Sequence, residues 1–191
     1  MPIRPVRIYG DPVLRNKARE VAAVDETLRA LIVDLRDTMR AYNGVGLAAN
    51  QVGVLQRVLV VDVPLDEERR EQVAIVNPVI VSRSGAEVGE EGCLSIPGIY
   101  DDVKRATRVR VRGLDEHGTP LELDAEGYLA RALQHEVDHL DGILFVDRLS
   151  LLKRQFLRRA LDALARGELP EDYRPAGAVP AAPPRGAGGR S

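Results

Sequence analysis

The chain has 191 residues, of which 45% are hydrophobic and 29% are charged, and these values exclude a wholly disordered protein. No apolar run reaches the roughly 18 residues that span a bilayer, and the first residues lack the apolar core of a signal peptide, so we expect a cytoplasmic protein without membrane contact. The 27 basic and 29 acidic residues give a net charge of −2, which gives no reason to expect free nucleic acid as a substrate.

Hydrophobic spacing predicts the elements of the first half of the chain. A short helix is expected at residues 11–18, and a longer amphipathic helix at 25–42 with Asp25 as its N-cap. The β-branched runs at 57–63 and 73–81 predict strands. Pro78 interrupts the second run and requires an edge position or a bulge there.

The second half begins with a hairpin and ends with two helices. Residues 107–112 and 121–123 predict paired strands around a turn that contains His117. A helix is expected from Asp124 to Asp141, stopped by Gly142, and a last amphipathic helix at 149–166. Because strands precede helices without alternating with them, the order predicts an α+β fold with antiparallel sheets. We expect one catalytic domain over 1–168 and a disordered Pro/Gly/Ala-rich tail over 169–191.

The predicted helix at 124–141 carries an HExxH run. His135 and His139 are four residues apart and lie one above the other, so both imidazoles can reach one ion, and Glu136 lies beside them about 100° around the axis. These three side chains border the apolar side of the helix, and its other polar residues fall on the opposite side: Arg131, Gln134, Asp138 and Asp141.

A tetrahedral catalytic metal site needs a third protein ligand. A carboxylate downstream of the helix is one candidate, but none of Asp147, Asp162 and Glu168 is marked out by its context. The other candidate is Cys93, the single cysteine, which lies in a segment framed by glycines and a proline where the backbone can approach a ligand closely. A third segment, Gly44 to Gly53, matches neither a dinucleotide fingerprint nor a phosphate loop, and its spacing alone indicates a turn that ends a helix.

Taken together, the three segments resemble peptide deformylases, whose motifs GxGLAAxQ, EGCLS and HExxH are matched in order by 44–51, 91–95 and 135–139. The resemblance implies an α+β fold with antiparallel sheets around a central metal-binding HExxH helix and a C-terminal amphipathic helix. It implies a hydrolase that removes the formyl group from N-formylmethionine at the start of new proteins and releases formate. It also implies one divalent metal ion, usually Fe(II), with Zn, Ni or Co as alternatives.

The resemblance carries over specific roles. Cys93, His135 and His139 are the implied metal ligands, and Glu136 is the implied general base. The side-chain amide of Gln51 and the backbone N–H of Leu94 are the implied donors to the oxyanion. The expected substrate-binding residues are those whose backbone can pair with a nascent peptide: Val45, Gly46, Gly92 and Leu94.

Two further expectations concern partners and alternatives. The helix at 149–166 gathers Arg154, Arg158 and Arg159 on one face, and some deformylases dock on the ribosome through such a helix, so the ribosome is a predicted partner. The alternative functions are an HExxH zinc peptidase that cleaves internal peptide bonds and uses a ligand other than Cys93, and a metal-stabilised binding module without catalysis.

Overall fold

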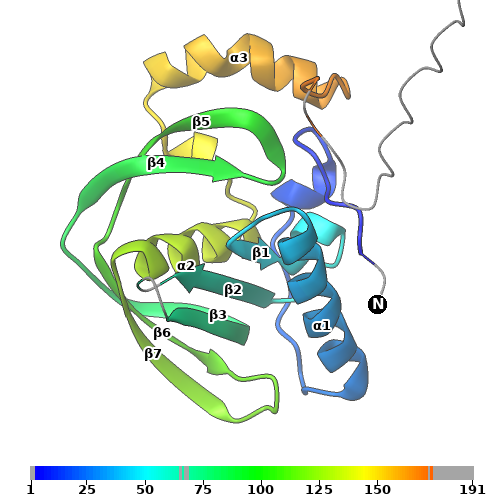
Figure 1. Ribbon diagram of the computed structural model, residues 1–191, viewed down its shortest axis with the longest axis vertical. Coiled ribbons are helices and arrows are strands. Elements are labelled where there is room, and N and C mark those ends of the chain that lie inside the picture. Colours follow the sequence, from blue (N-terminus) through cyan, green and yellow to red (C-terminus); the bar gives the residue numbers. More distant parts are fainter. Residues whose placement is uncertain (1–2, 65, 67–68, 172, 174–191) are drawn as a thin grey trace, which may run out of the picture.

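The computed structural model describes residues 3–64, 66, 69–171 and 173. Helix α2 (Gly127–Leu140) runs through the middle of the molecule, between a five-stranded sheet on one side and a two-stranded sheet on the other (Figure 1). Helix α1 (Glu26–Ala41) flanks the larger sheet, and helix α3 (Leu151–Ala165) covers the outside of the smaller one. The predicted α+β fold around a central HExxH helix is confirmed.

Both sheets are antiparallel. The larger has the order β1-β2-β3-β6-β7, with bounds Gly46–Ala48, Val58–Pro64, Arg70–Ser84, Arg108–Leu114 and Pro120–Glu126. The smaller pairs β4 (Glu87–Cys93) with β5 (Ile96–Arg105). Short 3₁₀ helices are η1 (Pro12–Arg15), η2 (Ala49–Val52) and η3 (Phe145–Arg148). The helix expected at 11–18 is thus the shorter η1.

Strand β3 contains the bulge that Pro78 predicts. The pairing register between β3 and β6 shifts between Val76 and Val79, on either side of the proline. β3 is not an edge strand, because it lies between β2 and β6. Of the two ways to accommodate a proline that has no N–H to donate, this chain uses the bulge.

Helix α2 begins three residues later than the sequence predicts. Asp124 lies in β7, where it pairs with Arg110 of β6 at 2.7 Å, and the ladder continues to Glu126. The chain turns into the helix at Gly127, which has a φ of 56°, a conformation that glycine adopts at low cost. The cross-strand pairing therefore outweighs the helix-start signal of Asp124.

Helix α1 follows its prediction closely. The Asp25 side chain accepts a hydrogen bond from the Leu28 N–H at 2.8 Å, as an N-cap does. Its buried apolar residues recur at helical spacing and pack against β1 and β2: Leu28, Leu31, Ile32, Leu35 and Met39. This packing holds the segment that follows α1 against the central helix.

The position of α2 between two sheets corrects one expectation. Gln134 and Asp138 were expected on the side away from the core, yet both are buried. Gln134 donates to the Ala106 carbonyl and accepts from the Ala106 N–H, which ties α2 to the connection between β5 and β6. The helix therefore has an apolar face toward the larger sheet and a buried polar face toward the smaller one.

Helix α3 buries less apolar surface than its pattern suggests. Leu161 and Leu164 are buried in the cluster that includes Phe145, whereas Leu151, Leu152 and Phe156 are exposed. In the part of the chain that the structure describes, no helix combines the length and apolarity needed to cross a membrane. Most of the predicted tail, residues 172 and 174–191, lies outside the described residues.

Candidate active site

The predicted metal ligands come together where α2 faces the end of β4. The Cys93 Sγ lies 3.1 Å from the His139 Nε2, which lies 3.2 Å from the His135 Nε2. A register shift between Gly92 and Cys93 marks a bulge that re-aims the strand here, a device common next to active sites. The side chains of the two histidines, one helical turn apart, and of the cysteine at the bulge therefore converge on a single position.

A buried carboxylate orients His135. Glu91 lies 3.0 Å from the His135 Nδ1, so the Nε2 faces the other ligand atoms. Glu91 accepts two hydrogen bonds from Arg105, both at 2.9 Å, and one from Arg131 at 2.9 Å. Burial raises the pKa of Glu91, but its hydrogen bonds with His135 and Arg105 outweigh this and hold it well below the usual value. Glu91 is therefore a permanent anion.

The same network reaches the buried polar face of α2. Arg105 also donates to Asp138, the residue before His139, and Arg148 of η3 donates to the other side of Asp138. Arg105 therefore links two carboxylates: that of Glu91, which pairs with His135, and that of Asp138, which precedes His139. Arg105 is itself buried, so this ion-pair network lies in the interior and not on the surface.

The surroundings of the two histidines shift their pKa values in opposite directions. Burial lowers the pKa of His135, but hydrogen bonds with Cys93 and Glu91 raise it well above its usual value. Burial, followed by the charges of His135 and Arg105, lowers the pKa of His139 well below its usual value.

Glu136 follows His135 in the chain, is buried, and is not a member of the Cys93, His135 and His139 cluster. Burial raises its pKa to about 7, and its Oε2 has no hydrogen-bond partner among the described residues. A carboxylate with a pKa near the working pH and a free oxygen is suited to receive and return a proton. A Cβ at Gly46 would lie 2.4 Å from the Glu136 Oε1, so the absence of a side chain at Gly46 makes room for this carboxylate.

The donor set fits a divalent metal ion. Ligand atoms bound to one tetrahedral ion at about 2.0–2.3 Å lie roughly 3.3–3.6 Å apart, close to the 3.1 and 3.2 Å separations here. The ligand atoms of Cys93, His135 and His139 all lie within 4.8 Å of one another. The anions Glu91 and Glu136 favour a positive charge at this spot, and a metal ion supplies it.

The segment after α1 supplies the remaining side of the site. In η2 the Gln51 Oε1 accepts from the Ala48 N–H at 2.9 Å, which points the Nε2 at the Cys93 Sγ, 3.5 Å away, and at the Ser95 hydroxyl, 3.2 Å away. Asn50 donates to the His139 backbone carbonyl and locks η2 onto α2. Gln51 therefore presents an amide donor to the metal-ligating spot.

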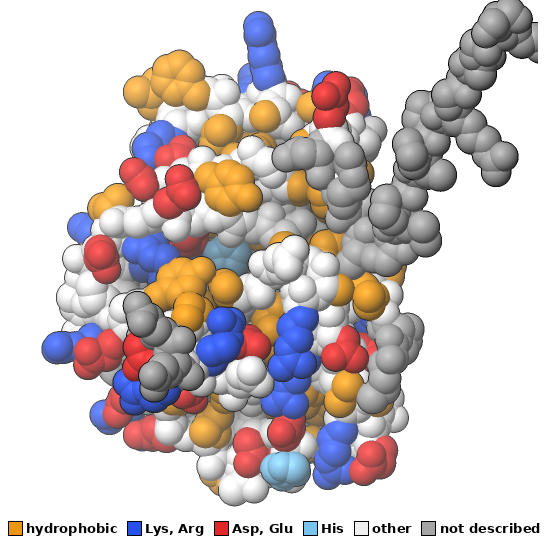
Figure 2. Space-filling model, in the orientation of Figure 1, with side chains coloured by type: hydrophobic (Ala, Val, Ile, Leu, Met, Phe, Trp, Pro, Cys, Tyr) orange, Lys and Arg blue, Asp and Glu red, His pale blue; other side chains and the backbone are white. Residues whose placement is uncertain are grey.

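A cleft of about 480 Å³ opens over these groups, within the range of small-molecule and peptide sites. In Figure 2 a histidine surface is visible at the floor of a hollow with hydrophobic side chains on its rim. All the predicted substrate-binding residues line this cleft: Val45, Gly46, Gly92 and Leu94. His117 is exposed in the hairpin turn and is not part of the His/Cys cluster found among the described residues.

Several cleft residues had no signal in the sequence. Four of the five tyrosines line the cleft, namely Tyr42, Tyr100, Tyr128 and Tyr173. They come from four separate segments, and Tyr173 lies in the stretch predicted to be a disordered tail. No local motif connects them, so their convergence is visible only in three dimensions.

A cysteine sulfur and two imidazoles beside a buried glutamate, at the floor of an open cleft, are the groups of a metal-dependent hydrolase of the HExxH type. Comparison with known proteins identifies the family within this class of hydrolases. The sequence profile described as polypeptide deformylase matches residues 3–155. A peptide deformylase from Alkalilimnicola ehrlichii is 52% identical over 166 residues, which cover 87% of this chain and 93% of that protein.

Solved structures agree with this match. A peptide deformylase from Legionella pneumophila superposes with a TM-score of 0.79 at 50% identity, covering 87% of this chain and 98% of that one. A class I type b peptide deformylase from Acinetobacter baumannii, solved with Met-Ala-Ser bound, gives a TM-score of 0.74 at 38% identity and covers 78% and 99%. The chain belongs to the polypeptide deformylase family. It is an enzyme that removes the formyl group from the N-terminal methionine of new proteins, so the peptidase and the non-catalytic alternatives are set aside.

Proposed function

We propose that Cys93, His135 and His139 hold one divalent metal ion and that Glu136 is the general base of deformylation. The observation that carries this proposal is the convergence of three ligand atoms beside a buried carboxylate with an unpartnered oxygen. When bound, the metal polarises the formyl carbonyl and lowers the pKa of a water molecule. We propose Fe(II) as the working ion, with Zn, Ni or Co as substitutes, because one thiolate and two imidazoles suit borderline cations.

In this proposal, groups of the protein transfer the proton of the attacking water and stabilise the negative charge that develops on the formyl oxygen. Glu136 takes a proton from the water that attacks the formyl carbon and later returns it to the leaving amine. The Gln51 side-chain amide and the Leu94 backbone N–H donate to the oxyanion that forms on the formyl oxygen. Support comes from Gln51, whose Nε2 lies 3.5 Å from the proposed ligand Cys93.

The substrate peptide is proposed to bind as an added strand. The cleft is lined by Val45 and Gly46 at the start of β1 and by Gly92 and Leu94 at the end of β4. An extended substrate peptide can form backbone hydrogen bonds with these segments. Such pairing recognises the main chain of the peptide and therefore tolerates different side chains. The related Acinetobacter baumannii enzyme was solved with Met-Ala-Ser bound, which supports a peptide in this cleft.

The test is formate release from a formyl-methionyl peptide, with the protein prepared anaerobically and its metal content measured. We expect turnover proportional to bound metal. The variant Cys93→Ser should lose most of its metal and its activity together, because a hydroxyl is a far weaker ligand than a thiolate. A Cys93→Ser protein that binds metal like the wild type would overturn the ligand assignment.

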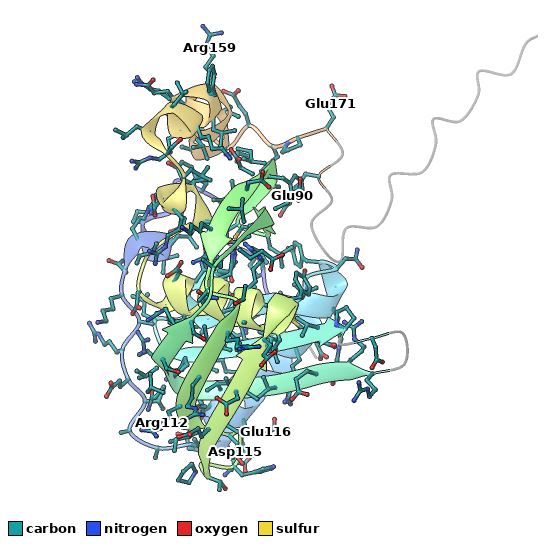
Figure 3. The ribbon with its side chains drawn as sticks, turned by 90° about the vertical axis from the view of Figure 1, so that its left-hand side faces the viewer. Glu90, Arg112, Asp115, Glu116, Arg159 and Glu171 are labelled. Carbon is teal, nitrogen blue, oxygen red and sulfur yellow. The ribbon has the colours of Figure 1, made fainter. Side chains whose placement is uncertain are left out.

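We further propose that the enzyme works in the cytoplasm as one catalytic domain, over about residues 1–168, and docks on the ribosome through α3. The basic face is defined by Arg154, Arg158 and Arg159, all exposed, and Figure 3 shows Arg159 projecting away from the body of the protein. Changing the three arginines to glutamate should abolish co-sedimentation with ribosomes at low salt, because phosphate contacts are electrostatic. Wild-type binding by this triple variant would refute the docking.

A further inference from the structure

The chain returns to the active-site cleft after α3. The helix ends at Ala165 with Arg166 as its C-cap, and Gly167, with a φ of 84°, redirects the backbone. Pro170 and Tyr173 then line the same cleft as Cys93 and His135. The family profile ends at residue 155, so this contribution to the cleft lies outside the region by which the family was identified.

Specific contacts hold the returning segment. A Cβ at Gly98 would lie 2.9 Å from the Pro170 Cγ, so the bare backbone of Gly98 lets the proline ring approach β5 closely. The Tyr173 N–H donates to the Pro170 carbonyl at 2.9 Å and makes a turn. Burial and a side-chain hydrogen bond with Tyr42 raise the pKa of Tyr173 to about 12. The segment therefore touches both Gly98 of β5 and Tyr42 at the end of α1.

The position of Tyr42 relative to the reaction centre follows from the backbone. Gly46 lies against the Glu136 carboxylate, and Tyr42 is four residues earlier in the chain. Four residues span at most about 14 Å, and an extended peptide advances about 3.3–3.6 Å per residue. A peptide with its formyl group at Glu136 that runs past Gly46 toward Tyr42 therefore reaches Tyr42 and Tyr173 within about its first four residues.

We propose that Pro170 and Tyr173 form an outer wall of the cleft that contacts the third and fourth residues of the substrate and favours apolar or aromatic side chains there. The inference rests on the proposed function, because it takes this cleft as the peptide site. Tyrosine rings offer large, rigid apolar faces, and Tyr42, Tyr100 and Tyr128 line the same cleft.

The test compares two substrates of equal length, formyl-Met-Ala-Phe-Phe and formyl-Met-Ala-Gly-Gly. The readout is the ratio of their kcat/KM values, which cancels any general loss of active enzyme. Variants are made in the full chain: Tyr173→Ala removes the ring, and Tyr173→Phe keeps it without the hydroxyl. Glu171→Ala is the matched control, since Glu171 belongs to the same segment and its side chain points away from the body of the protein in Figure 3.

We expect the wild type to prefer the Phe-Phe peptide. Tyr173→Ala should lower the ratio about 3- to 10-fold through a higher KM for that peptide, as expected when an aromatic contact is lost. Tyr173→Phe should keep most of the preference, and Glu171→Ala should keep all of it.

Three results would overturn the inference. They are a wild type that does not discriminate, a ratio that Tyr173→Ala leaves unchanged, and equal acceleration of both peptides in Tyr173→Ala, which would make the segment an obstruction. Absence of formate release by the metal-loaded wild type from either peptide would overturn the proposed function itself, and this inference with it.

Discussion

Replacing Gly46 by alanine tests the geometry of the site with a single methyl group. The added Cβ would lie 2.4 Å from the Glu136 Oε1 and 2.8 Å from its Cδ, whereas ordinary carbon–oxygen contacts are about 3.3–3.6 Å. The carboxylate must therefore move by about 1 Å, and a displacement of that size can cost about 10²-fold in rate. We expect Gly46→Ala to lower kcat about 100-fold.

The backbone of β1 itself should tolerate the change. Gly46 is not among the residues with positive φ, and alanine in a strand is roughly 0.5–1 kcal/mol more favourable than glycine. Thermal unfolding and metal content should therefore match the wild type while formate release falls.

Gly89→Ala in β4 is the control for this test. Its Cβ would meet the end of the flexible Arg131 side chain at 2.9 Å rather than the base. A folded, metal-loaded Gly46→Ala enzyme that keeps more than half of the wild-type kcat would refute the proposed position of Glu136.

Four further predictions follow from the same contacts. Glu136→Ala should keep the fold and the metal but lose about 10²–10⁴-fold in kcat; more than a tenth of wild-type activity would contradict its role as base. Gln51→Leu should lower kcat about 10²–10³-fold, whereas a change confined to KM would make Gln51 a ground-state binder. Arg105→Met removes two of the hydrogen bonds that the buried Glu91 carboxylate accepts and should cost about 3–5 kcal/mol in urea unfolding, far more than Arg110→Met at an exposed pair. The pKa of Glu136 is raised to about 7 and a bound cation lowers it, so kcat should fall with decreasing pH, with a midpoint below pH 7; a midpoint above 7 would contradict this.

The sequence by itself carried the chemistry of the site. The HExxH spacing places His135, Glu136 and His139 on adjacent parts of any helix, because the helical repeat is fixed by the backbone. Helix α1 was equally predictable, since Asp25 caps it and its apolar residues recur at helical spacing. The third ligand was different. Residue spacing left Cys93 and a downstream carboxylate both open, and the resemblance of three motifs favoured the cysteine.

Other features of the fold and the site depend on the tertiary structure and could not be predicted from local sequence patterns. Strands β4 and β5 were not predicted, because they are held mainly by pairing with each other and β4 buries little apolar surface. Asp124 lies in a strand instead of starting a helix because its side chain pairs with Arg110 of the neighbouring strand β6. Asp138 is buried because a second sheet covers its side of α2 and supplies Arg105. The return of Pro170 and Tyr173 to the cleft depends on contacts with Gly98 and Tyr42, more than 70 residues away in the chain. Local sequence fixes the direction of a side chain on its own element, but its burial and partners depend on which distant segments pack against that element.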